Sequence, residues 1–177
     1  SGVDLHSYQP TAEDILTITT CDLLIYVGGE SDEWIEDALS ERSNPDMVAL
    51  NLLDVLGGRA LQEELVEGME GEAEEDSDEI EYDEHIWLSL KNAEKLVQAI
   101  ADAMAEIDPE NAGTYTANAE NYVNQLVDLD AAYQSAVAAG EKDTLLFGDR
   151  FPFRYLTDDY GLKYYAAFVG CSAETEA

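Results

Sequence analysis

Residues 91–140 read KNAEKLVQAIADAMAEIDPENAGTYTANAENYVNQLVDLDAAYQSAVAAG, and this stretch decides the fold. Apolar side chains recur every three or four residues over 91–107, which predicts an amphipathic helix. Pro109 interrupts the pattern and suits the first position of a new helix, which Gly140 would end. The second helix, over 109–139, would be about 45 Å long at 1.5 Å per residue. Its apolar residues have no heptad repeat, so we expect it to bridge two lobes rather than form a coiled coil.

Strand-like and helix-like segments alternate on both sides of this helical pair. A helix is predicted to begin at Thr11, which forms a capping-box pattern with Asp14, another to be capped by Ser31, and a short one to cover 153–160. Short apolar runs predict strands, the first of them a buried parallel strand, over 23–27, 47–50, 144–148 and 164–169. The alternation predicts an α/β fold.

The order of these segments predicts three parts of the chain. We expect a first α/β lobe over 1–108, the long inter-lobe helix over 109–140 and the start of a second α/β lobe over 141–177. Residues 63–84 are dense in Asp and Glu and contain no Lys or Arg. Like charges at this density repel and stay solvated, so we expect a mobile loop at about 68–81 within the first lobe.

The charge of the chain excludes several classes of partner. Among 177 residues, 40 are acidic and 8 are basic, which gives a formal net charge of −32. Nucleic acid and anionic membrane surfaces both require a basic footprint that this chain lacks.

No apolar run approaches the roughly 18–20 residues that span a bilayer. The two cysteines, Cys21 and Cys171, are too few for a disulfide scaffold.

The chain has two histidines, His6 and His85, and each lies in a segment that leads into a predicted helix. Loops of this kind assemble ligand sites in α/β folds, and neutral imidazole is a preferred zinc ligand. The alternative is that each histidine is an isolated surface or packing residue. Glycine-rich phosphate-binding motifs and the Gly-x-Ser-x-Gly elbow are absent from the sequence, which predicts no nucleotide site and no hydrolase of that type.

Three segments together resemble a known family. They are VDLHSYQPTAEDI (3–15), DEHIWLSLKNAEKLVQAI (83–100) and FGDRFPFRYLTDDYGLKYYAAF (147–168). In this order they are similar to the metal-specific solute-binding proteins of ABC importers, the TroA-like zinc-uptake type. The residues that match the first two family motifs are His6, Tyr8, Pro10 and Asp14, followed by His85, Trp87, Lys91, Asn92 and Ala93.

The resemblance implies a two-lobed TroA-like fold with a long linking helix, truncated at both ends, and no enzymatic activity. It implies that His6 and His85 are metal ligands in the cleft between the lobes, with zinc as the bound ion and manganese as an alternative. The family's third ligand position falls on Arg150, which stays protonated and cannot bind a cation. Glu174 or Glu176 could supply a carboxylate, and the fourth ligand would lie beyond the chain.

The same resemblance implies an extracytoplasmic protein, lipid-anchored at the bacterial cell surface or periplasmic, that delivers zinc to an ABC permease. Exposed sheet edges would also permit a homodimer. The alternatives are a manganese- or iron-binding member of the family, a metal-dependent hydrolase that uses the same histidines, and a calcium-responsive or adhesive surface protein that works through the acidic loop.

Overall fold

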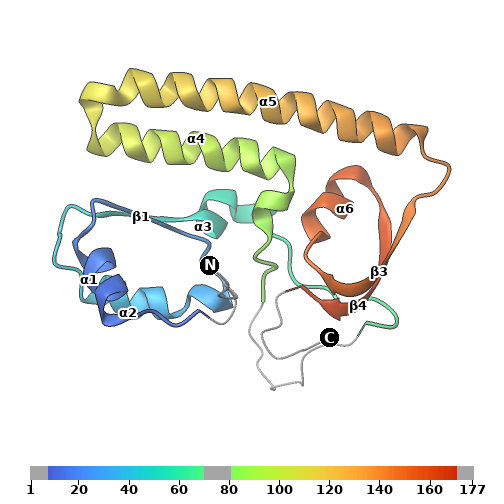
Figure 1. The fold of residues 1–177 in the computed structure, drawn as a ribbon, viewed down its shortest axis with the longest axis horizontal. Coiled ribbons are helices and arrows are strands. Elements are labelled where there is room, and N and C mark those ends of the chain that lie inside the picture. Colours follow the sequence, from blue (N-terminus) through green and yellow to red (C-terminus); the bar gives the residue numbers. More distant parts are fainter. Residues whose placement is uncertain (1–7, 70–80, 171–177) are drawn as a thin grey trace.

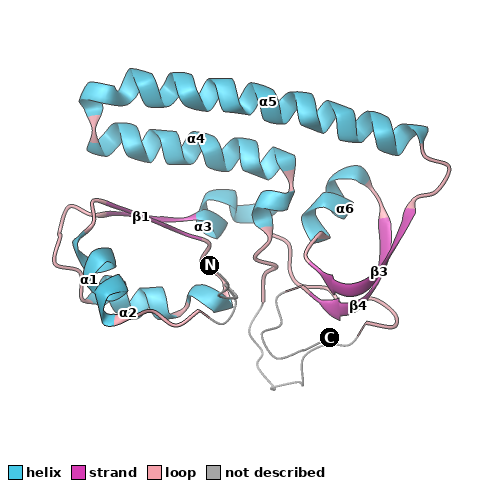
Figure 2. Cartoon of the chain, viewed as in Figure 1, coloured by secondary structure: helices cyan, strands magenta, loops and turns pink. Residues whose placement is uncertain are grey.

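The computed structural model describes residues 8–69 and 81–170, and its ribbon is drawn in Figure 1 and coloured by secondary structure in Figure 2. Helices and strands alternate through most of it. In chain order the elements are α1 (Ala12–Thr20), β1 (Leu23–Tyr26), α2 (Trp34–Ser40), β2 (Val48–Asn51), α3 (Leu52–Leu56), α4 (Leu90–Ile107), α5 (Ala112–Ala139), β3 (Thr144–Phe151), α6 (Arg154–Tyr160) and β4 (Lys163–Val169). The predicted α/β class is confirmed.

The first sheet pairs β1 with β2 in parallel, in a register that places Leu23 beside Val48. The prediction of parallel strands is therefore correct. The prediction that the first strand is buried is wrong, because β1 is half-buried and Ile25 is 39% exposed. A parallel strand is fully buried only when helices cover both faces of its sheet. The described sheet has two strands, and the exposure of Ile25 shows that one side of β1 is not covered.

Helix α1 begins as its sequence predicts, whereas α2 does not. The Thr11 hydroxyl accepts a hydrogen bond from the backbone of Asp14, and the Asp14 carboxylate accepts one from the backbone of Thr11, which completes the capping box. Ser31 lies in a 3-10 turn, Glu30–Asp32, and does not cap α2. The Asp32 carboxylate instead accepts hydrogen bonds from the backbone N–H groups of Val27 and Gly28, so it stabilises the loop that follows β1.

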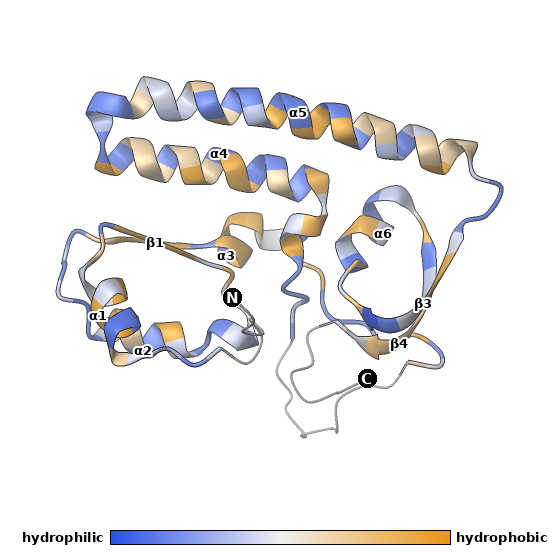
Figure 3. Cartoon of the chain, in the orientation of Figure 1, coloured by the Kyte–Doolittle hydropathy of each residue, from blue (hydrophilic) through white to orange (hydrophobic). Residues whose placement is uncertain are grey.

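Helices α4 and α5 form an antiparallel pair, and α5 continues past the start of α4 toward α6 (Figure 1). A 3-10 turn, Pro109–Asn111, precedes α5, so this helix has 28 residues and is about 42 Å long. Its buried side chains are Ala119 and Leu126, and polar and apolar residues mix along its length (Figure 3). No helix in the described part of the chain is long and apolar enough to cross a membrane.

The second sheet pairs β3 with β4 in parallel, and α6 lies between them in the chain. The three elements form a complete βαβ unit, in which β3 extends past the predicted end at 148 to Phe151 through a register shift between Phe147 and Arg150. The aromatic ring of Phe151 stacks on Tyr164 of β4, with centroids 3.8 Å apart. This stacking holds the extended end of β3 in the core of the unit.

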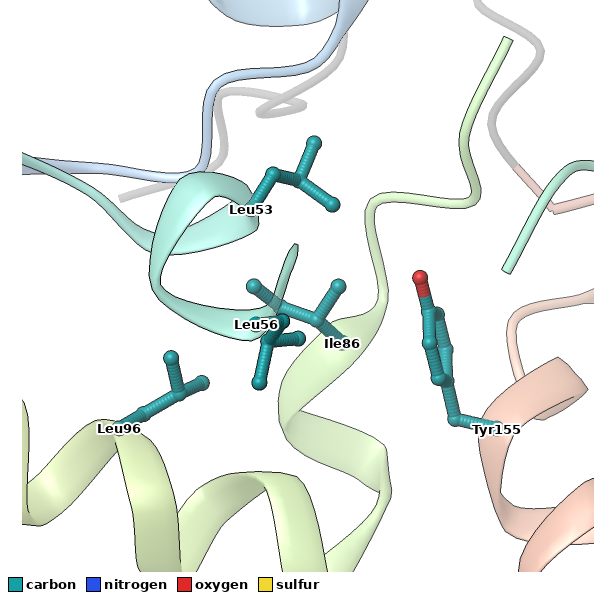
Figure 4. Packing of buried hydrophobic residues seen from close by; sticks show 5 residues of the cluster. All are labelled: Leu53, Leu56, Ile86, Leu96 and Tyr155. Atoms are coloured by element: carbon teal, nitrogen blue, oxygen red, sulfur yellow. The ribbon is translucent and has the colours of Figure 1, made fainter. Parts of the chain in front are cut away.

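A hydrophobic core joins the two sheet-containing regions. It contains side chains from α3, α4 and α6 and from the 3-10 turn Ile86–Leu88 (Figure 4). Its buried members are Leu53, Leu56, Ile86, Leu96 and Tyr155. Because Ile86 directly follows His85, this core sets the position of the histidine.

Most of the predicted mobile loop, 68–81, lies outside the described residues. The segments before and after it pair with each other as antiparallel chain. Gln62 and Tyr82 form an isolated bridge, the Glu63 N–H donates to the Glu81 carbonyl (3.0 Å), and the Asp83 N–H donates to the Leu61 carbonyl (3.0 Å). The base of the acidic segment is thus closed two residues before His85.

Candidate metal centre

His85 is buried, with 7% of its surface exposed, between the closed base of the acidic segment and the turn that leads into α4. Ser89 caps α4 by accepting the Asn92 N–H (3.0 Å), and its hydroxyl donates to Asp159 of α6 (2.5 Å). The Nζ atom of Lys91 also lies 3.2 Å from the Asp159 carboxylate. The residues that follow His85 are therefore held by both α4 and α6.

The imidazole of His85 contacts a buried carboxylate. Its Nδ1 atom lies 3.1 Å from Asp83 Oδ1, and the same oxygen accepts the His85 backbone N–H at 2.8 Å. Asp83 is 4% exposed. Because this oxygen already accepts a backbone N–H, the geometry suits an Nδ1–H donor, and in that tautomer the lone pair of the ring is on Nε2. Metal-ligating histidines use this arrangement in many proteins.

The loop after β1 packs against the residue that precedes His85. The Glu84 carboxylate is buried and accepts the Ser31 N–H at 2.8 Å. A Cβ atom on Gly29 would lie 2.3 Å from Glu84 Oε1, so a larger residue there would displace the Glu84 side chain. The carboxyl end of β1 therefore lies beside the histidine segment.

The carboxyl ends of β3 and β4 reach the same place from the other side. Gly170, directly after β4, passes so close that an added Cβ atom would lie 2.7 Å from the Phe151 carbonyl oxygen and 3.2 Å from Cε1 of His85. His85 thus lies where the carboxyl ends of both parallel sheets meet, which is where α/β proteins bind ligands.

A polar cluster flanks this position on the side of the acidic segment. The Arg154 guanidinium lies 3.1 Å from Glu64 Oε2, and the Tyr164 hydroxyl donates to the same oxygen (3.4 Å). Burial, together with the negative charge of Glu64, raises the pKa of Tyr164 to about 12. The tyrosine hydroxyl stays protonated at neutral pH and acts as a donor there.

The structure locates only part of the predicted site. His6, Glu174 and Glu176 lie outside the described residues. Arg150 is half-buried on β3, and its backbone N–H donates to Asp149 Oδ1 (2.8 Å). Within 8–69 and 81–170, no three His, Cys, Asp or Glu side chains converge to hold a metal. The assignment of His6 and His85 as ligands stays a prediction.

Sequence reasoning missed two residues at this site, Asp83 and Tyr155. The Tyr155 hydroxyl, from α6, donates to the Asp83 carbonyl at 2.8 Å. An Asp two residues before a residue whose N–H it accepts is the spacing of an Asx turn, and this was the available signal for Asp83. Tyr155 is 72 residues from Asp83 in the chain, and only the packing of α6 reveals the contact.

Comparison with protein families gives a match over the whole chain. The family model described as "Zinc-uptake complex component A periplasmic" matches residues 1–177. The chain belongs to this zinc-uptake family. It is a family of zinc-binding solute-binding proteins of ABC importers, which bind metal ions and are not enzymes. The prediction from the three sequence motifs is confirmed at this level.

Relatives of the zinc-uptake family agree in sequence and in fold. The chain is 29% identical over 180 residues to the zinc-binding lipoprotein AdcA of Streptococcus pneumoniae, covering 99% of this chain and 34% of the relative. It is 32% identical over 168 residues to the high-affinity zinc uptake system protein ZnuA of Bacillus subtilis, covering 92% of this chain and 50% of the relative.

A solved structure gives the same result for the fold. The Zn(II)-bound ZnuA-like domain of Streptococcus pneumoniae AdcA superposes with a TM-score of 0.74 at 27% identity, covering 95% of this chain and 56% of that chain. The predicted TroA-like fold is confirmed, as an α/β fragment with a long helix. This chain spans about a third to a half of the length of these curated relatives.

Proposed function

We propose that this chain captures zinc outside the cytoplasmic membrane for delivery to an ABC permease, with His6 and His85 as protein ligands. The observation that carries the proposal is the buried His85 ring. Its Nδ1 is bonded to Asp83, so Nε2 has the lone pair that a metal requires. Capture and delivery need binding without chemistry, which agrees with a family of solute-binding proteins.

Zinc is the preferred ion because imidazole nitrogen binds Zn²⁺ more strongly than Mn²⁺ in the general order of metal affinities. Manganese is the alternative, and iron a further one. Arg150, which stays protonated, would not be a ligand, so the remaining ligands come from elsewhere in the protein. The hydrolase alternative has no support, because the family is not enzymatic.

The proposed location is the bacterial cell surface, through a lipid anchor, or the periplasm. The matched family is described as periplasmic, and one of the relatives is a lipoprotein. The proposed partner is the membrane permease of an ABC importer. A role in cell adhesion has no observation behind it.

The test is zinc binding by the His85→Ala variant, measured by competition with a chromophoric chelator. Loss of a residue that only supports a ligand lowers metal affinity about 10- to 100-fold. Loss of a ligand itself is therefore expected to weaken zinc binding at least about a hundredfold. His6→Ala is expected to give a comparable loss. Zinc should also raise the unfolding temperature of the wild-type protein but not of the variants, because a ligand stabilises the state that binds it.

The control addresses non-specific attraction of cations by a chain of net charge −32. Asp102 on α4 is exposed and accepts a hydrogen bond from Gln98, remote from His85 in the chain. Asp102→Asn removes one surface charge and should keep wild-type zinc affinity. Unchanged affinity in both histidine variants would reject the proposed function.

A further inference from the structure

The hydroxyl of Tyr155 joins α6 to the chain segment that precedes His85. It donates to the Asp83 carbonyl oxygen at 2.8 Å and accepts the Leu61 N–H at 3.0 Å. The Asp83 N–H donates to the Leu61 carbonyl at 3.0 Å, which closes a ring of three hydrogen bonds. Tyr155 is 2% exposed and lies beside the segment that carries Ile86 (Figure 4). This ring fixes the main chain of Asp83.

The side chain of Asp83 passes that restraint to the imidazole. Its Oδ1 atom accepts hydrogen bonds from the backbone N–H of His85 (2.8 Å) and from Nδ1 of the ring (3.1 Å). Both residues are buried, with 4% and 7% of their surface exposed. Because Oδ1 already accepts the backbone N–H, it faces Nδ1 as an acceptor, and such a partner selects the Nδ1–H tautomer of the ring.

We propose that Asp83 and Tyr155 are positioning residues, which together hold His85 in its Nδ1–H tautomer, with the ring lone pair on Nε2. The inference rests on the proposed function, because the position of the lone pair matters only if His85 binds zinc. It makes the βαβ unit β3–α6–β4 part of the ligand site, because the Tyr155 hydroxyl of α6 bonds to the Asp83 carbonyl and acts on His85 through Asp83.

The variants are chosen to remove one link at a time. Asp83→Ser keeps a side-chain oxygen that can accept the His85 backbone N–H and preserve the turn, but this oxygen does not reach the ring. Tyr155→Phe removes only the hydroxyl and keeps the buried ring. Asp83→Ser should weaken zinc binding about 10- to 100-fold. Tyr155→Phe should weaken it about fivefold, the effect of one neutral hydrogen bond.

The decisive measurement is the tautomer of His85 in the metal-free, full-length protein. Long-range ¹H–¹⁵N correlation spectra at alkaline pH, where the ring is neutral, distinguish Nδ1–H from Nε2–H, and His85→Gln identifies the signals. We expect the Nδ1–H form in the wild type and a mixture in Asp83→Ser and Tyr155→Phe. Tyr160→Phe is the matched control on the same helix: it removes a hydroxyl that donates to Asp130 (2.9 Å) and should leave the tautomer and zinc affinity unchanged.

The outcomes separate this inference from the proposed function. An Nε2–H ring in the wild type, or an Nδ1–H ring unaffected by both substitutions, overturns the positioning role even if His85→Ala abolishes zinc binding. A tautomer shift in Tyr160→Phe also overturns it, because the effect would then be general loosening of α6. Unchanged zinc affinity in both His85→Ala and His6→Ala overturns the proposed function, whatever the tautomer spectra give.

Discussion

Ile86 is the residue on which the histidine segment depends for its packing. It has no exposed surface, and it lies in the core that α3, α4 and α6 share (Figure 4). Its neighbour His85 is therefore placed by an apolar contact on one side and by the Asp83 carboxylate on the other. A cavity at this position would disturb both the stability of the protein and the site.

We predict that Ile86→Ala lowers the free energy of unfolding by about 2–5 kcal/mol, the usual cost of a large cavity in a core. Urea unfolding monitored by circular dichroism measures the loss. Leu16→Ala is the matched control because Leu16, on α1, is 63% exposed. That control should change stability by less than about 0.5 kcal/mol, and an equal loss in the two variants would contradict the prediction.

At the residue scale, sequence reasoning located His85 but not what orients it. The spacing of His85, Trp87 and Lys91 matches the family motif and therefore could be recognised without a structure. Asp83 stood in a run of acidic residues, where its Asx-turn spacing to His85 is a weak signal. Glu84 is buried as well, so what distinguishes Asp83 is its contact with the His85 ring, in a segment that the Tyr155 hydroxyl of α6 holds.

The elements were predictable where the local pattern is strong. Helix α4 and the capping box of α1 follow their sequence signals, because local hydrogen bonds and one apolar face decide them. Helix α3 was not predicted. It has five residues, Leu52–Leu56, and its start depends on the Asn51 side chain, which accepts the Asp54 N–H. A run this short carries too little periodicity to separate from a strand end.

Strand β4 provides a prediction on pH. Burial raises the pKa of Tyr164 to about 12 in the folded state, from 10.0 for the ordinary side chain. Because the folded pKa is the higher one, the stabilisation is complete below pH 10 and is lost as the pH rises toward about 12. We predict a fall in the free energy of unfolding across this range, measured by urea unfolding at successive pH values.

The same series on Tyr164→Phe isolates the contribution of this hydroxyl. The variant lacks the ionisable group, so its stability should decline less between pH 10 and 12 than that of the wild type. The difference in the free energy of unfolding between the two proteins at pH 7 gives the contribution of the lost contact with Glu64 and serves as the reference. Parallel declines above pH 10 would show that Tyr164 does not ionise in this way.

On the scale of the whole molecule, the second sheet leaves one apolar face without cover in the described residues. Leu146 of β3 is 84% exposed, and Tyr165 of β4, its neighbour in the register, is 47% exposed. The opposite face packs Leu145, Phe147 and Tyr164 into a core. Exposed apolar patches of this kind promote association.

We therefore predict that the 177-residue chain self-associates through this face, which is a different surface from the sheet edges expected to permit a homodimer. Sedimentation velocity at moderate salt should detect a concentration-dependent dimer, since salt screens the repulsion of a net charge of −32. Leu146→Lys should reduce the association, whereas Leu16→Lys makes the same change on α1 and should not. A monomer at every concentration, or equal effects of the two substitutions, would contradict the prediction.

The sequence alone determined the α/β class, the helical pair, the family and His85 as a candidate ligand. Each depends on local periodicity or on motifs in a fixed order, and both can be recognised without knowledge of the tertiary contacts. The division at 108 and 140 and the ligand role of His6 stay predictions. Only the tertiary structure decided that Asp83 and Tyr155 accompany His85, because hydrogen bonds across 72 residues arise from how α6 packs on the histidine segment.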